Sequence, residues 1–473
     1  MFDTIIIGGG PAGYLAAERL RQEKKKVLLI EQRHLGGTCL NSGCIPTKTL
    51  LNSAKLFVHA KEAQKFGVKI DSVSYDWNVV QNWKTEVVAK LRFGIESIMK
   101  RTGAQTVSAR GVIVSPPSGD KPAKVKSISP NAANEETVHE GRTILVCAGS
   151  VPVMPPIPGS KDNPLVVDST ALLSVNTVPK NLTVIGGGVI GIEFAGLFSS
   201  LGCKVTVIEM MEEIIPFMDK ELASILRKAM KDVDFKLSSK VEKIENGKVF
   251  YSDKNGRQES TDSDLILLAA GRRPVLDNWG AQEAGIYILK GGGVNVDDYM
   301  RTNISGIWAA GDVTGKSLLA HSAYRMGEVA AADIISSLDG REKNKSHNVS
   351  NRMRYNAIPW AVYGITEAAG AGITEQEAAA KGIDIIKASI PMKVSGRFAA
   401  ENTFSGAGAV KVIADAANKR ILGVHAVGAY APEFIWGACA LIEQEFRIDD
   451  VKQLIFPHPT VSELIKDVMW EMK

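Results

Sequence analysis

The sequence predicts an α/β protein with two Rossmann-like dinucleotide-binding domains and a C-terminal α+β domain. Three observations support this fold class. A glycine-rich strand–turn–helix pattern occurs twice, at residues 4–31 and again at residues 182–209. Two closely spaced cysteines follow the first copy. From about Arg352 onward, apolar strands alternate with helices. A chain of 473 residues is long enough for about three domains.

The first glycine pattern leads from an apolar strand to the acidic residue Glu31. Gly8, Gly10 and Gly13 have the spacing G-x-G-x-x-G. The first glycine of such a turn permits the tight bend, the second lets the backbone approach a pyrophosphate at the helix N-terminus, and the third lets the helix pack on the strand. A carboxylate at the position of Glu31 can accept hydrogen bonds from a ribose hydroxyl. The pattern therefore predicts a dinucleotide site.

The next segment, residues 36–48, places Cys39 and Cys44 five positions apart. A distorted helical turn can bring two Cα atoms at this spacing within ~4.4–6.8 Å, the range that a disulfide requires. Because the pair adjoins a dinucleotide site, we expect it to be redox-active. The alternatives are two unrelated buried thiols or half of a metal site. Against a metal, the other cysteines stand singly in apolar segments.

The middle of the chain contains short strands and two candidate domain boundaries. Residues 107–146 predict antiparallel strands, broken by two prolines and by a polar loop at about 130–136. The proline-rich residues 151–159 predict a stiff linker. A second boundary is expected after residues 269–274, which include Gly271.

The second glycine pattern repeats the first. Gly186, Gly188 and Gly191 precede Glu209, and in both copies the acid falls 23 residues after the first glycine. Two such sites imply two dinucleotides, one bound permanently and one exchanging, with electrons passing between them. Because Glu209 would repel the 2′-phosphate of NADP and no arginine follows it closely, we predict NAD.

Residues 306–313 predict a buried strand that ends in Gly311 and Asp312. A carboxylate there could meet a ribityl or ribose hydroxyl at the carboxyl end of the sheet. The alternative is that Asp312 caps a helix that begins at Leu318.

The C-terminal region predicts a strand at residues 409–414, a helix at residues 431–445 and a candidate base at His458. Histidine has the intrinsic pKa that proton transfer to and from a thiol requires. If a helix begins near Pro459, Glu463 can turn back and fix the imidazole tautomer. The alternative is that His458, between two prolines, is a rigid turn residue.

Composition limits the function classes. Hydrophobic content is 45%, charged content is 23% and the net charge is +4. The longest basic run is three lysines, so nothing favours nucleic acid or a membrane surface as a partner. We expect no leader segment and no membrane span, and five cysteines suit a reducing compartment, so the predicted location is the cytoplasm.

Across nearly the whole chain, these motifs resemble the FAD-dependent pyridine nucleotide–disulfide oxidoreductases. Within that family they are similar to the enzymes that oxidise dihydrolipoamide with NAD. The resemblance is carried by both glycine patterns and by the following motifs: GGTCLNSGCIPTK, AAGRRP, IWAAGDV, LLAHSA and HPTVSE.

The resemblance implies a domain layout and a homodimer. It implies an FAD-binding domain in two parts, residues 1–149 and 274–350, the second part also forming the central domain. Residues 150–273 would bind NAD, and residues 351–473 would form the interface domain, which completes the active site of the other subunit.

The resemblance also implies roles for single residues. Cys39 would exchange with the substrate, and Cys44 would face the flavin. Lys48 and Glu193 would form an ion pair beside the flavin, and His458 with Glu463 would be the base and its orienting partner. The implied cofactor contacts are Gly8, Gly10, Gly13, Glu31, Lys48, Gly311, Asp312 and Ala320 for FAD, and Gly186, Gly188, Gly191, Glu209 and Gly271 for NAD.

The implied substrates are lipoamide and the dihydrolipoyl groups on lipoyl domains of a 2-oxo acid dehydrogenase or glycine cleavage complex. The chain departs from the family pattern before His458, where Phe456 and Pro457 replace His and Ala, and at Tyr363-Gly364, where Tyr-Thr is usual. Another disulfide or metal-ion reductase of the same architecture is therefore the alternative. A non-catalytic nucleotide-binding subunit is disfavoured because the redox residues are all present.

Overall fold

The structure is a computed structural model that describes residues 1–129, 135–340 and 351–472. It confirms the predicted α/β fold class. The chain divides into two compact units. The first comprises residues 1–49, 81–153 and 272–354, and the second comprises residues 50–80, 154–271 and 355–473.

A seven-stranded sheet forms the centre of the first unit, with the strand order β3-β2-β1-β6-β5-β4 and β17 paired with β6. The strands β3, β2, β1, β6 and β17 are parallel, and the predicted antiparallel strands follow as β4, β5 and β6. Part of the predicted polar loop, residues 130–134, lies outside the described residues. The strands are β1 (Phe2–Ile7), β2 (Val27–Glu31), β3 (Gln105–Ser108), β4 (Arg110–Ser115), β5 (Ala123–Ile128), β6 (Glu136–Val146) and β17 (Ile307–Ala309).

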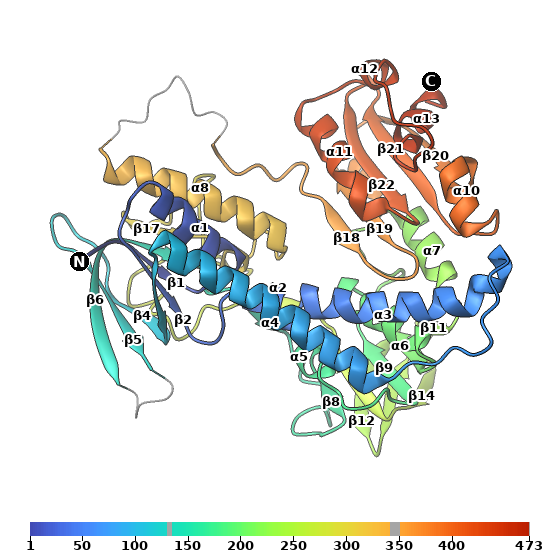
Figure 1. Cartoon of the computed structure of the whole chain (residues 1–473), viewed down its shortest axis with the longest axis horizontal. Coiled ribbons are helices and arrows are strands. Elements are labelled where there is room, and N and C mark those ends of the chain that lie inside the picture. Colours follow the sequence, from blue (N-terminus) through green and yellow to red (C-terminus); the bar gives the residue numbers. More distant parts are fainter. Residues whose placement is uncertain (130–134, 341–350, 473) are drawn as a thin grey trace. The chain divides into compact units, whose positions relative to one another are not determined.

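Helices α1 (Pro11–Gln22) and α8 (Ala320–Leu338) run side by side in this unit (Figure 1). Small residues permit the close approach, because a Cβ on Gly327 would lie 2.5 Å from the Ala12 carbonyl oxygen. The other elements of the first unit are α2 (Gly37–Ser42), α3 (Cys44–Glu62), α4 (Trp77–Thr102), η2 (Asp312–Thr314) and the paired strands β7 (Ser150–Pro152) and β16 (Arg272–Pro274). Part of α3 and part of α4 belong to the second unit.

The second unit repeats the arrangement of the first glycine pattern. Its parallel sheet has the order β11-β10-β9-β15-β8, so the strand before the glycine turn again pairs with the strand that ends in the acid. Apolar residues fill these strands because helices and loops cover both faces of a parallel sheet. The elements are β8 (Val166–Val167), α5 (Ser169–Leu172), β9 (Asn181–Ile185), α6 (Val189–Ser200), β10 (Lys204–Ile208), α7 (Lys220–Ala229), β11 (Val233–Lys236), β12 (Lys240–Glu245), β13 (Lys248–Ser252), β14 (Gln258–Asp262) and β15 (Leu265–Leu268).

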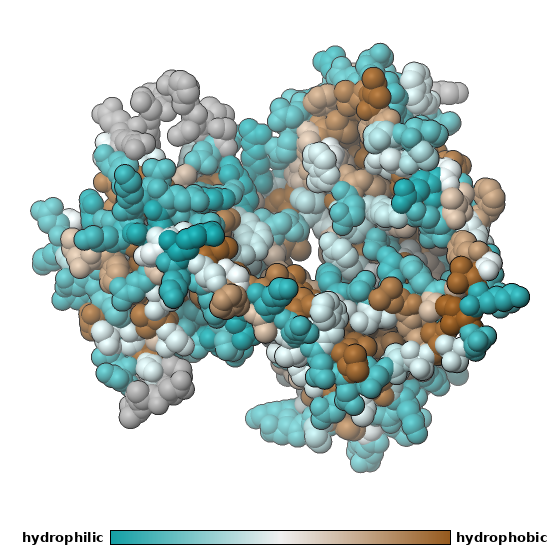
Figure 2. Space-filling view, in the orientation of Figure 1, coloured by the Kyte–Doolittle hydropathy of each residue, from teal (hydrophilic) through white to brown (hydrophobic). Residues whose placement is uncertain are grey.

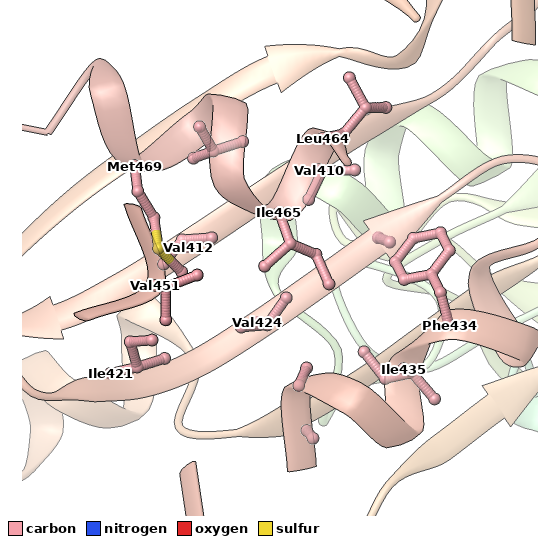
Figure 3. Packing of buried hydrophobic residues seen from close by; sticks show 14 of the residues in the cluster. Val410, Val412, Ile421, Val424, Phe434, Ile435, Val451, Leu464, Ile465 and Met469 are labelled. Atoms are coloured by element: carbon pink, nitrogen blue, oxygen red, sulfur yellow. The ribbon is translucent and has the colours of Figure 1, made fainter. Parts of the chain in front are cut away.

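An antiparallel sheet of five strands, in the order β18-β19-β22-β21-β20, forms the C-terminal part of the second unit. Figure 3 shows its core, where Val410, Val412 and Val424 of the strands meet Ile435 and Ile465 of the helices. The helix predicted at residues 431–445 ends at Glu443. The elements of this C-terminal part are β18 (Trp360–Val362), β19 (Ala368–Gly372), α9 (Glu375–Ala380), β20 (Ile385–Pro391), η3 (Met392–Val394), α10 (Gly396–Asn402), β21 (Ala409–Asp415), β22 (Ile421–Val427), α11 (Ala431–Glu443), α12 (Ile448–Lys452) and α13 (Leu464–Trp470). Elsewhere in the second unit, the short helix η1 (Ala63–Phe66) follows α3.

Large apolar side chains are exposed on this C-terminal part. Ile455 is 97% exposed, Phe404 78% and Trp436 71%. Figure 2 shows hydrophobic residues scattered among the polar ones on the visible surface. Among the helices of the described residues, none combines the length and apolar character that crossing a membrane requires.

Candidate active site

The first glycine turn joins β1 to α1 and has the geometry that close backbone approach requires. Gly8 has φ 104°, and a Cβ on it would lie 2.1 Å from the Cys147 carbonyl oxygen. A Cβ on Gly13 would lie 1.9 Å from the Gly8 carbonyl oxygen. At Gly10 the nearest atom to an added Cβ is 3.8 Å away, so the helix N-terminus is accessible at this glycine. The turn therefore fits a pyrophosphate over the N-terminus of α1.

The second glycine turn, between β9 and α6, has the same geometry. A Cβ on Gly186 would lie 2.5 Å from the Ala269 carbonyl oxygen, and one on Gly191 would lie 2.0 Å from the Gly186 carbonyl oxygen. No atom lies within 4 Å of a Cβ built on Gly188. The residues present thus fit two dinucleotides.

The two predicted acids occupy equivalent places beside the turns. The Glu31 carboxylate accepts a hydrogen bond from the Gly9 N–H at 2.7 Å, and the Glu209 carboxylate accepts one from the Gly187 N–H at 2.5 Å. Each acid is therefore held against the turn, where a ribose hydroxyl would be placed. Gly271, which was predicted to contact NAD, follows β15 with φ 105° and open space around it.

Asp312 lies directly after β17 and Gly311, at the carboxyl end of the first sheet. Its carboxylate accepts a hydrogen bond from the Ser150 hydroxyl at 2.6 Å, and Arg272 donates to the same hydroxyl at 2.9 Å. Burial raises the pKa of Asp312, while Ser150 and Arg272 lower it. Asp312 begins η2 and does not cap α8, whose first residue is Ala320, so the capping alternative is wrong. Its contact with FAD stays a prediction.

Cys39 and Cys44 lie on successive helices and not on one distorted turn. Helix α2 ends at Ser42, and α3 begins at Cys44, with Gly43 between them. Both cysteines are half-buried thiols, and no disulfide joins them. The neighbouring Cys44 thiol and burial raise the pKa of Cys39, whereas the positive charge of Lys48 lowers it. Cys44 therefore acts directly on the ionisation of Cys39.

The side chain of Asn41, within the dithiol segment, fixes the conformation of this segment. Asn41 donates to the carbonyl oxygens of Leu35 at 3.0 Å and Gly37 at 2.9 Å, and its own oxygen accepts from Arg92 Nε at 2.9 Å. Because Arg92 lies on α4, far along the chain, no local pattern predicts this contact.

Glu193 lies on α6 in the second unit and is 5% exposed. Its carboxylate accepts a hydrogen bond from the Tyr363 N–H at 3.0 Å. Tyr363 matches the tyrosine of the family pattern, and the departure begins at Gly364. The contact is made by the Tyr363 backbone and needs no particular side chain. Lys48 belongs to the first unit, and the predicted ion pair between Lys48 and Glu193 stays a prediction.

His458 and Glu463 meet as predicted, although by a different route. His458 Nδ1 and Glu463 Oε2 are 2.9 Å apart. The expected helix start near Pro459 is wrong, because α13 begins at Leu464. Residues 458–463 form a loop, in which the Thr460 N–H donates to the second carboxylate oxygen of Glu463 at 3.3 Å.

The site residues fall into two groups, one in each unit. The first unit brings together the first glycine turn, Cys39, Cys44, Lys48 and Asp312, and the second unit holds the second glycine turn with Glu209, Glu193, His458 and Glu463. Two dinucleotide turns and a dithiol pair define a nucleotide-dependent dithiol–disulfide redox protein.

Comparison with known proteins agrees with this class. Residues 2–327 match the family model described as pyridine nucleotide–disulphide oxidoreductase, and residues 358–469 match its dimerisation domain. The chain belongs to the pyridine nucleotide–disulphide oxidoreductase family and is an oxidoreductase with a dimerisation domain. FAD and NAD, the predicted cofactors, are those of the lipoyl-oxidising members of this family.

Curated relatives match the chain over nearly its whole length. A dihydrolipoyl dehydrogenase of Geobacillus stearothermophilus is 33% identical over 98% of this chain and 94% of its own. A dihydrolipoyl dehydrogenase of Thermus scotoductus is 36% identical over 98% of this chain and 95% of its own.

Two solved structures are also similar. The Cu(II) complex of RclA, a flavoprotein disulfide reductase from Escherichia coli, has a TM-score of 0.84 at 27% identity and covers 100% of this chain and 99% of its own. LpdA from Mycobacterium tuberculosis has a TM-score of 0.87 at 23% identity over 100% of this chain and 99% of its own, which shows the shared fold alone.

Proposed function

We propose that this chain is a dihydrolipoyl dehydrogenase that oxidises protein-bound dihydrolipoyl groups and reduces NAD⁺ through a Cys39–Cys44 disulfide. The observation that carries the proposal is the pair of interacting thiols, Cys39 and Cys44, which lies in the same unit as the first dinucleotide turn. The curated relatives add the substrate, because they are named for it and match the chain from end to end.

The chemistry of the dithiol side follows from the chain's own residues. A substrate thiolate attacks Cys39 in the disulfide, forms a mixed disulfide with it and releases Cys44 as a thiolate. The second substrate thiolate then attacks the substrate sulfur, so that Cys39 leaves with the electron pair. The substrate is oxidised to a disulfide, and the Cys39–Cys44 disulfide is reduced to a dithiol by the same two electrons. FAD, when bound, supplies the path by which these electrons reach NAD⁺.

His458 holds the proton that this exchange moves. Its Nε2 is free to take a proton from the substrate thiol, because Nδ1 contacts Glu463. Lys48 stabilises negative charge at the cysteines, since it lowers the pKa of Cys39. In this assignment Glu193 pairs with Lys48, and Glu31, Asp312 and Ala320 contact FAD, while Glu209 and Gly271 contact NAD.

The proposal includes the assembly and its location. Two copies form a homodimer through residues 351–473, and each copy supplies His458 to the other's dithiol. Residues 1–149 and 274–350 bind FAD, and residues 150–273 bind NAD. The partners are lipoyl domains of a 2-oxo acid dehydrogenase or glycine cleavage complex. Its location is the cytoplasm, whose reducing conditions suit free thiols.

The test is a steady-state assay of NAD⁺ reduction by dihydrolipoamide, with glutathione as the competing substrate and NADP⁺ as the competing nucleotide. Turnover with dihydrolipoamide and NAD⁺ supports the proposal, and its absence in FAD-loaded protein contradicts it. The Cys39→Ser variant is the control for a route that bypasses the dithiol.

A second candidate is a reductase of another disulfide or of Cu(II). Phe456 and Pro457, which replace the family's His and Ala beside the base, favour it because they alter the residues next to the substrate. The similar RclA is described as a disulfide reductase and has been solved as a Cu(II) complex. Faster NADH oxidation with Cu(II) or with another disulfide than with lipoamide would favour this candidate.

A further inference from the structure

Two tyrosines form a hydroxyl pair in the first unit. Tyr14 on α1 and Tyr324 on α8 are 310 positions apart in the sequence, and their hydroxyl groups are joined by a short hydrogen bond. The ring centroids are 5.8 Å apart at an interplanar angle of 76°, an edge-to-face arrangement. Both side chains are half-buried. Neither the first glycine pattern nor the dithiol motif predicts that these two tyrosines meet.

Three contacts, one with backbone and two with alanine Cβ atoms, place this pair near the redox cysteines. A Cβ on Gly37, in the first turn of α2, would lie 2.6 Å from the Gly10 Cα at the start of α1. Helix α8 meets the same end of α1, since a Cβ on Gly311 would lie 3.4 Å from the Cβ atoms of both Ala12 and Ala323. Tyr14 and Tyr324 thus lie within about one turn of the point where α1 and α8 converge with α2, the helix that carries Cys39.

The electrostatics of the pair agree with this placement. Burial and the hydrogen bond to Tyr324 raise the pKa of Tyr14. Burial raises the pKa of Tyr324, the hydrogen bond with Tyr14 lowers it, and Cys39 and Cys44 raise it by a smaller amount. Both phenols are therefore neutral at physiological pH. Two neutral phenols carry two protons, of which the bond between them uses one. The other proton remains for a neighbouring acceptor.

We propose that the Tyr14–Tyr324 pair is a positioning element that donates a hydrogen bond to the Cys39 sulfur when Cys39 leaves as a thiolate. The role in exchange rests on the proposed function. In the dithiol state the neighbouring Cys44 and burial raise the pKa of Cys39 and so favour its protonated thiol, and in the disulfide Cys39 carries no charge. The phenol becomes its partner when the mixed disulfide with the substrate breaks and the electron pair goes to Cys39. The proton stays on the phenol, so no further reactant is needed.

The test measures the ionisation of Cys39 without any substrate. The protein is reduced, and alkylation of Cys39 by iodoacetamide is followed against pH by peptide mass spectrometry. Tyr324→Phe removes a hydrogen bond that would stabilise the charged thiolate of Cys39. We therefore expect this substitution to raise the pKa of Cys39 alkylation by about one pH unit. Tyr14→Phe should raise it by less, because Tyr324 keeps its own proton.

The control variant is Tyr251→Phe, which removes a buried hydroxyl that donates to Glu259 at 2.9 Å in the second unit. All three substitutions keep the ring and its packing. Should one tyrosine variant fail to fold, the other gives the result. An unchanged alkylation profile in the folded variants overturns the proposal, as does an equal change in Tyr251→Phe.

A kinetic measurement separates this proposal from the proposed function. Tyr324→Phe should slow reduction of the protein by dihydrolipoamide about tenfold, while NADH-driven reduction of ferricyanide stays unchanged. If the unmodified protein does not react with dihydrolipoamide but the alkylation profile still moves, the lipoyl substrate is wrong and the role of the tyrosine pair stands. If the protein reacts with dihydrolipoamide but the alkylation profile does not move, the lipoyl substrate is supported and the proposed role of the tyrosine pair is wrong.

Discussion

His458 Nδ1 lies 2.9 Å from Glu463 Oε2, although no helix connects the two residues. The side chain of His458 is 79% exposed within one chain, whereas that of Glu463 is only 16% exposed. The partly buried carboxylate therefore holds one imidazole nitrogen, while most of the imidazole surface stays exposed within the chain. A histidine that served only as a turn residue would not need this partner.

We predict that His458→Gln lowers turnover with dihydrolipoamide by about two to four orders of magnitude, the usual contribution of a positioned acid–base group. Reduction of the protein by NADH should change much less, because the proton is needed at the exchanging sulfur. Stopped-flow measurement of the two half-reactions tests this. If both slow equally, or if only thermal stability falls, His458 is not the base.

We predict that the protein prefers NADH over NADPH by about tenfold or more, because the Glu209 carboxylate repels a 2′-phosphate. Glu209→Gln should narrow the preference mainly by improving the KM for NADPH, since the amide oxygen can still accept from the Gly187 N–H. Comparable kcat/KM values for the two nucleotides in the unmodified protein would show that Glu209 does not select NADH over NADPH.

The sequence predicts the parts of the fold and site that depend on short spacings. Both glycine turns and both acids could be placed because each pattern spans one strand–turn–helix–strand unit, and the structure gives each acid the same contact with its turn. The strand at residues 409–414 also appears, as β21, because continuous apolar residues indicate a buried strand.

The contacts that the sequence does not predict join distant segments. Tyr14 and Tyr324 meet only because α1 and α8 pack together, and Lys411 meets Asp219 across 192 positions. Periodicity carries no information on such pairs. The helix start at Leu464 was missed for a related reason, since the loop before it is held by hydrogen bonds to Glu463 and not by helix propensity.

We predict that Lys411→Met strongly destabilises the second unit. Lys411 lies 3.0 Å or less from carboxylate oxygens of Asp219, Glu221 and Glu375, and Asp219 is 1% exposed. Removing the cation leaves a buried carboxylate unpaired, which costs about 3–5 kcal/mol. Urea unfolding at fixed protein concentration measures the loss. Lys240→Met, at an exposed ion pair, is the control and should cost at most about 1 kcal/mol.

The same cluster predicts a pH dependence. Lys387 and Lys411 lower the pKa of Glu375. A carboxyl whose folded pKa is lowered stabilises the protein above its unfolded pKa, and this contribution is lost as the pH falls through the folded value. Glu375→Gln should therefore lower stability near neutral pH and make little difference in acid below both pKa values. Urea unfolding at the two pH values tests this, and an equal loss at both would exclude the linkage.

We predict that Cys44→Ser abolishes turnover with dihydrolipoamide while FAD remains bound. Cys44 is the first residue of α3, whereas the dinucleotide turn is made by Gly8, Gly10 and Gly13, whose backbone does not depend on the thiol. Cys39→Ser should lose turnover equally, because either change removes the disulfide. Flavin absorbance of the purified variants and NADH-driven reduction of ferricyanide measure the retained function. Loss of flavin from Cys44→Ser alone would show that the thiol helps to hold the cofactor and would contradict this division between binding and exchange.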